Sequence, residues 1–133
     1  MYRCMLAAVL LILICESGFA AEKKRVGIGG LVGEWSGTSL CQVKPSPCHD
    51  EEVVFRLSHP EKDKIRLQAD KIVDGKAVTT GVDDWFYDSA SQVLIWEIPR
   101  GTWKLTVDGD EINGTLITRD NVVFRKVHLH RSK

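Results

Sequence analysis

The chain has 133 residues, and its 18 Lys and Arg balance 18 Asp and Glu for a formal net charge of zero. This length suits a single domain. A balanced charge argues against nucleic acid as the main partner, because binding to phosphates requires a basic surplus.

The first 21 residues predict an export signal. A short basic start at Met1–Arg3 precedes the apolar run Leu6–Cys15, and small residues at Gly18 and Ala20 stand where a signal peptidase cuts. The apolar run is too short to cross a bilayer, so we expect no membrane span. The exported protein is therefore expected to be periplasmic or secreted.

The segment after the signal, residues 22–32, is expected to be a flexible N-terminal tail. Its glycines, Gly27, Gly29 and Gly30, are too closely spaced for a regular helix or strand. The remaining residues, 33–133, then form the folded domain.

The cysteines predict one disulfide. Cys4 and Cys15 lie in the predicted signal, which leaves Cys41 and Cys48 as the only possible pair in the exported chain. An oxidising compartment favours their bond. The loop that they close is short, and the loop-entropy model gives about 2.5 kcal/mol of stabilisation.

From Gly33 onward, apolar and polar residues alternate with a period of two, which is typical of strands with one buried face. The clearest alternating runs are 53–58, 64–70 and 102–107. Turn residues such as Asp74-Gly75 and Asp108-Gly109 separate the runs. The pattern predicts an all-β protein, an antiparallel up-and-down barrel of eight or nine strands between Gly33 and His130, because closure removes exposed edges.

The segment Gly33-Glu34-Trp35 resembles the Gly-x-Trp start of the first strand in lipocalins and related calycin barrels. The resemblance implies that Trp35 packs across the closed barrel end under a basic residue from near the last strand, for which we expect Arg125 ahead of Arg131. The wider run 33–41, followed by 47–51, is similar to a group of uncharacterised exported bacterial proteins with small lipocalin-like barrels. That group implies a fold and no particular activity.

Large aromatic side chains are numerous for a small domain, and they are the candidate ligand-binding residues: Phe55, Trp85, Tyr87, Trp96 and Trp103. Aromatic rings are also the usual filling of a barrel core. The interior of an eight-stranded barrel is either filled by its own side chains or just wide enough to hold one small ligand. The sequence leaves both interpretations open.

The sequence contains no convincing constellation of catalytic groups. Asp83, Asp84 and Asp88 cluster with Glu97, but they flank a predicted strand, where Asp normally belongs to turns. No Gly-x-Ser-x-Gly elbow is present, and the exported chain has no free cysteine to act as a nucleophile. We therefore expect a protein that is not an enzyme and has no cofactor.

Two histidines, His128 and His130, share one face of the last predicted strand and could hold zinc with a third ligand from His49, Asp50 or His59. The simpler interpretation is an exposed polar strand, and we expect no metal site.

The sequence thus predicts an exported, non-catalytic, lipocalin-like barrel that binds a small apolar ligand. The alternative is a protein-interaction module, such as an exported protease-inhibitor-like barrel, with a filled interior and a functional loop or N-terminal arm.

Overall fold

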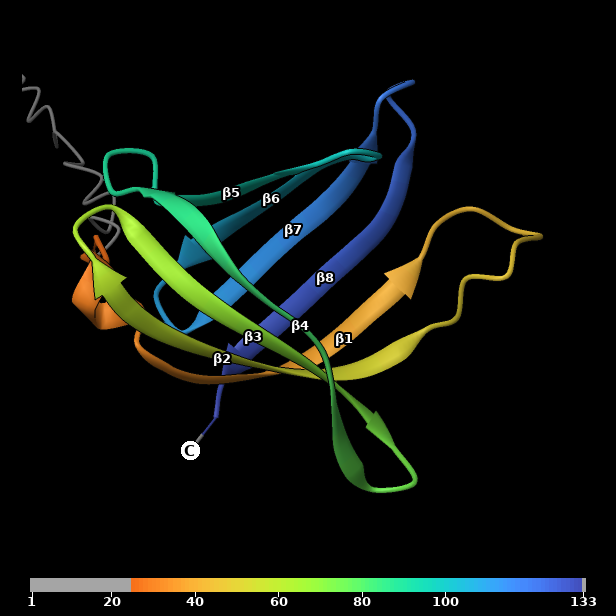
Figure 1. Ribbon diagram of the computed structural model, residues 1–133, viewed down its shortest axis with the longest axis horizontal. Coiled ribbons are helices and arrows are strands. Elements are labelled where there is room, and N and C mark those ends of the chain that lie inside the picture. Colours follow the sequence, from red (N-terminus) through yellow and green to blue (C-terminus); the bar gives the residue numbers. More distant parts are fainter. Residues whose placement is uncertain (1–24, 133) are drawn as a thin grey trace, which may run out of the picture.

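The computed structural model describes residues 25–132, and the predicted signal lies outside the described residues. Eight antiparallel strands form a closed barrel in which each strand pairs with its neighbour in the chain, and the last pairs with the first (Figure 1). The strands are β1 (Gly33–Cys41), β2 (Glu51–Glu61), β3 (Lys64–Val73), β4 (Lys76–Asp88), β5 (Val93–Ile98), β6 (Gly101–Asp108), β7 (Glu111–Thr118) and β8 (Val123–Arg131). The predicted up-and-down barrel is confirmed, with eight strands.

Alternation along the strands builds the core, because every second side chain points into the barrel. Leu94, Leu105, Ile112 and Leu129 are completely buried there. The β1–β8 ladder closes the ring from Trp35 opposite Arg131 to Cys41 opposite Arg125. Neither terminal strand is left with a free edge along this ladder.

The ladder between β4 and β5 is short. It contains only three Cα pairs, from Phe86 opposite Ile95 to Asp88 opposite Val93. Beyond these pairs, away from the turn that joins them, the two strands diverge from each other (Figure 1). The barrel wall therefore has a seam between the first part of β4 and the end of β5.

The β3–β4 hairpin projects beyond the barrel (Figure 1). Its register shifts between Ala69 and Asp70, which is typical of a β-bulge that bends a strand. Val73 and Val78 are both exposed on this hairpin.

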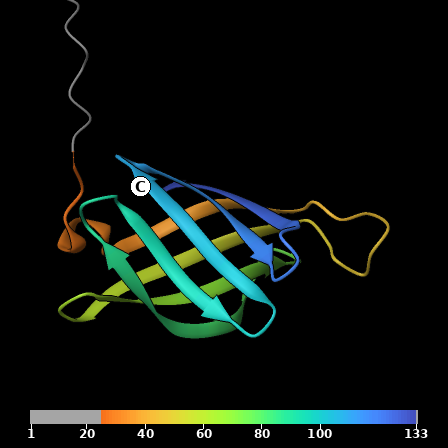
Figure 2. The ribbon, with the colours of Figure 1, turned by 90° about the horizontal axis from the view of Figure 1, so that it is seen from above.

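One end of the barrel is covered by the segment before β1. Residues Ile28–Leu31 form the short 3-10 helix η1, which lies against that end (Figure 2). Leu31 is completely buried, and Val26 and Ile28 pack against the core. The described part of the expected tail, residues 25–32, is thus docked on the barrel. Burial of its apolar side chains offsets the conformational freedom of the glycines between them.

The disulfide loop lies at the opposite end of the barrel from η1 (Figure 2). The sulfur atoms of Cys41 and Cys48 lie at bonding distance, with 6.0 Å between their Cα atoms, which confirms the predicted pair. The Asp50 carboxylate accepts a hydrogen bond from the Cys41 backbone N–H at 2.8 Å. This bond and the disulfide tie the end of β1 to the start of β2.

Candidate functional site

A cavity of about 230 Å³ lies inside the barrel beside the β4–β5 seam. Its lining comes from five consecutive strands, β2 to β6, and consists of Phe55, Leu67, Ala69, Thr80, Gly81, Asp83, Trp85, Trp96 and Trp103. Register brings these residues together, since Phe55 stands opposite Ala69 and Leu67 opposite Asp83. The cavity is therefore a product of the inner faces of these strands.

Three indole rings form one wall of the cavity. The Trp85 ring centre lies 5.3 Å from that of Trp96 and 6.2 Å from that of Trp103, with tilted planes. Trp96 and Trp103 are also direct cross-strand partners. Trp85 is buried, whereas Trp96 and Trp103 stay half-buried, so part of the aromatic wall is open to an incoming molecule.

Small residues create the space. Ala69 on β3 stands directly opposite Gly81 on β4, and Phe55 on β2 stands opposite Ala69 on its other side. A larger side chain at Ala69 would extend into the volume that the rings enclose. The hollow thus lies between two small residues, Ala69 and Gly81, and the aromatic wall.

Two of the lining residues carry a polar group without a partner in the described part of the chain. Trp85 is only 3% exposed, and its buried indole Nε1 has no hydrogen-bond acceptor. Asp83 faces inward and is half-buried, and no hydrogen bond or ion pair engages its carboxylate in residues 25–132. Buried polar groups are normally satisfied, so both are exceptions. Other atoms cover the Trp85 Nε1 donor, and only the Asp83 carboxylate is available to a molecule in the cavity.

The neighbouring Asp84 makes the contrast clear. It points to the outer face, where the Arg66 guanidinium donates two hydrogen bonds to its carboxylate, at 2.8 and 3.1 Å. These bonds lower the pKa of Asp84 from its ordinary value. One carboxylate of this acidic pair is thus fully engaged in the sheet surface, and the other is left free at the cavity.

Of the five aromatic residues predicted to bind ligand, Phe55, Trp85, Trp96 and Trp103 line this cavity together. Tyr87 does not line it. Its hydroxyl donates a hydrogen bond of 2.6 Å to the Val26 carbonyl under the N-terminal segment. Tyr87 shares the inner face of β4 with Trp85, but it lies further along the strand, beneath the closed end.

Sequence reasoning missed the non-aromatic lining residues Leu67, Ala69, Thr80, Gly81 and Asp83. Alternation already places residues 67 and 69 on one face of β3 and residues 81, 83 and 85 on one face of β4. Following that alternation through small and charged residues, as well as through aromatic ones, would have found four of these five.

The closed end holds Trp35, which is completely buried. Its indole Nε1 donates a hydrogen bond of 3.0 Å to the Leu31 carbonyl, and the Arg131 guanidinium carbon lies 4.2 Å from its ring centroid. Arg131 also donates hydrogen bonds to the carbonyls of Gly30 and Val32. The cation over Trp35 therefore also holds the segment that covers the barrel.

The expectation that Arg125 stacks on Trp35 is wrong. Arg125 pairs with Cys41 in the β1–β8 register, whereas Trp35 pairs with Arg131. Six residues of extended strand separate the two arginines, or roughly 20 Å. Arg125 instead donates hydrogen bonds to the Ser39 hydroxyl and the His49 carbonyl near the disulfide loop.

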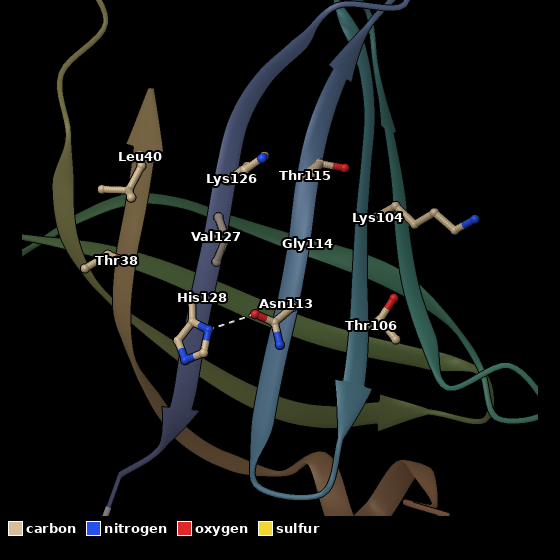
Figure 3. A pocket seen from close by; sticks show the side chains of 10 residues that line it. All are labelled: Thr38, Leu40, Lys104, Thr106, Asn113, Gly114, Thr115, Lys126, Val127 and His128. Carbon is tan, nitrogen blue, oxygen red and sulfur yellow. Dashed lines mark hydrogen bonds between the residues drawn. The ribbon is translucent and has the colours of Figure 1, made fainter. Parts of the chain in front are cut away.

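A larger hollow of about 550 Å³ lies on the outer surface of β1, β6, β7 and β8 (Figure 3). Gly114 is one of its lining residues, and a Cβ atom there would overlap the Lys104 carbonyl, because β6 and β7 approach closely at this point. His128 Nδ1 and Asn113 Oδ1 are 2.8 Å apart, while Lys104 turns away from the other lining side chains (Figure 3). The hollow is an exposed saddle between strands without converging groups, so we assign it no site.

Within residues 25–132, no group of three or more His, Cys, Asp or Glu is placed to hold a metal ion. His128 and His130 both face outward on β8. None of the helices in this part of the chain is long and apolar enough to cross a membrane.

The fold and the cavity together define a closed up-and-down β-barrel with one covered end and an aromatic pocket beside a seam in its wall. No protein-family model matches the chain. No curated protein matches it either.

Proposed function

We propose that this protein is an exported, non-catalytic barrel of the lipocalin-like type that binds a small, largely apolar ligand in its inner cavity. The observation that carries the proposal is the cavity of about 230 Å³ walled by Phe55, Trp85, Trp96 and Trp103. Pockets that combine apolar and aromatic walls with a few polar groups are the usual binding sites for small molecules. The lipocalin-like interpretation is further supported by Trp35, which is buried under Arg131 at the covered end.

The cavity suits a small ligand. Drug-sized ligands occupy pockets of about 300–1,000 Å³, whereas an engineered apolar cavity of about 150 Å³ binds benzene. A volume of about 230 Å³ therefore fits a molecule of one ring or an equivalent branched chain. The seam between β4 and β5 offers the route of access, since the lining residues Asp83, Trp85 and Trp96 belong to these two strands.

The absence of catalysis in this proposal rests on the lining of the cavity. Asp83 is the only ionisable side chain among the residues that line it. Acid–base and nucleophilic catalysis normally combine at least two positioned groups, such as a base and the nucleophile that it activates. A lone carboxylate among indoles supports recognition better than it supports chemistry.

Filling the cavity tests the function directly. In NMR spectra of the ¹⁵N-labelled protein, titration with cyclohexanol should shift the indole N–H signals of Trp85, Trp96 and Trp103 and leave that of Trp35 unchanged. Ala69→Leu should abolish these shifts, because its side chain takes up the ligand volume. The matched control Ala77→Leu changes an exposed residue on the projecting hairpin and should leave them intact. Equal binding by both variants would contradict the proposal.

Protein binding is the second candidate function, and the exposed Val73 and Val78 on the projecting hairpin favour it. The described part of the N-terminal segment is less suited to be an interaction arm, since it is docked on the barrel. Native mass spectrometry of the protein purified from its own host separates the two functions. A retained small mass supports ligand binding, whereas a retained polypeptide that is lost in the double variant Val73→Ser, Val78→Ser supports protein binding.

A further inference from the structure

The cavity has a charge that nothing in the described structure neutralises. Asp83 is its only ionisable lining residue, and the carboxylate has no partner in residues 25–132. Arg125 also lies on the inner face, across from Cys41 and Leu116, but it does not line the cavity, and Glu51 and Ser39 engage it. Arg66 is held by Asp84 on the outer face. A molecule that enters the cavity therefore meets an unpaired carboxylate.

The walls around this carboxylate are suited to a cation. The faces of aromatic rings carry negative electrostatic potential, and indole attracts cations more strongly than the other aromatic side chains do. Three indoles and one phenyl ring meet at this cavity, with Trp85 between Trp96 and Trp103. Aromatic groups of this kind are the usual receptors for organic ammonium ions.

We propose that the ligand of this cavity is a small organic ammonium ion. The ammonium group lies among the indole rings beside the Asp83 carboxylate. This inference rests on the proposed function and specifies its ligand class. A purely apolar ligand would strip water from Asp83 without replacing it, and an anion would be repelled by the same group.

A pair of probes with the same shape and different charge tests the inference. Choline carries a quaternary ammonium and a hydroxyl, and 3,3-dimethylbutan-1-ol is its neutral carbon analogue. Isothermal titration calorimetry at neutral pH and low salt should give at least about tenfold tighter binding of choline, a difference of about 1.4 kcal/mol. Asp83→Asn should bring the two affinities to within about twofold, since it removes the charge and keeps the shape.

The control variant is Asp84→Asn, which makes the same chemical change one residue away on the outer face of β4. It should preserve the preference for choline. If the neutral alcohol binds the unaltered protein as tightly as choline does, the inference is overturned and the proposed function stands. If neither probe binds, and cyclohexanol does not bind either, both are overturned.

Circular dichroism of each variant, compared with the unaltered barrel, establishes that it is folded.

Discussion

The covered end of the barrel and the cavity use the same kind of side chain in opposite ways. At the covered end, the indole N–H of Trp35 is bonded to the Leu31 carbonyl and its ring lies under Arg131. At the cavity, the indole N–H of Trp85 is equally buried but has no partner in the described structure. Both tryptophans are buried, so burial alone does not distinguish their two environments. The two residues differ in whether the polar atom of the ring has a partner.

The largest effect is expected at the covered end. Trp35→Ala should lower the free energy of unfolding by about 3–5 kcal/mol, because it removes a completely buried large ring and leaves a cavity. Trp96→Ala should cost less, since Trp96 is already half-exposed. Urea unfolding of the two variants gives the comparison. Equal losses would contradict the division between a structural and a binding region.

The disulfide loop should contribute the next largest effect. Cys41→Ser is expected to lower the free energy of unfolding by about 2–3 kcal/mol, because the closed loop no longer restricts the unfolded chain. Reduction of the unaltered protein with dithiothreitol should produce a similar shift in the urea midpoint. A variant as stable as the oxidised protein would show that the hydrogen bond from Cys41 to Asp50 alone orders this loop.

Tyr87→Phe probes the contact between the barrel and the segment that covers it. Loss of the hydrogen bond from the Tyr87 hydroxyl to the Val26 carbonyl should cost about 1 kcal/mol at neutral pH. Burial, with a smaller contribution from Asp88, raises the pKa of Tyr87 above its ordinary value. Stability from the neutral phenol is therefore present below pH ~10 and is lost as the pH rises beyond it.

The alkaline loss provides the measurement that is specific to Tyr87. Urea midpoints measured between pH 8 and pH 11 should fall less steeply for Tyr87→Phe than for the unaltered protein. Parallel profiles would exclude a contribution from this hydroxyl.

The smallest effect is expected at Asp84, on the outside of the cavity wall. The Arg66 hydrogen bonds lower the pKa of Asp84, so its contribution to stability is present above the ordinary carboxyl pKa of about 4 and is lost as the pH falls below it. Asp84→Asn should flatten the stability profile in this acidic range. An unchanged acidic slope in this variant would show that the Arg66 hydrogen bonds do not stabilise the ionised Asp84.

The sequence predicts the barrel well because alternation and turn residues are local signals, and β1 to β8 follow them closely. The place of each residue around the barrel is not determined by local sequence, because it depends on how the strands pair. Arg125 and Arg131 both stand on the last strand, and only the register with β1 determines that Arg131 reaches Trp35. The covering segment was missed for a similar reason, since Leu31 becomes core only once the barrel end exists beneath it.

The candidate site was predicted in part. Large aromatic residues are conspicuous in a sequence, and four of the five lie together at the cavity. The space itself depends on Ala69 and Gly81, which draw no attention in a sequence and meet only through the β3–β4 register. The unpaired state of Asp83 depends on what surrounds it in three dimensions, and Asp84 beside it shows the opposite outcome.

The three-pair ladder between β4 and β5 bears on where the barrel opens first. A ring of strands opens at the ladder that breaks most readily, and every other ladder here is longer. Local opening in native proteins begins where the fewest backbone bonds must break, and hydrogen exchange reports it. The amides of residues 86–88 and 93–95 should therefore exchange first among the strands. This ladder is therefore the expected place at which the ring of strands first opens.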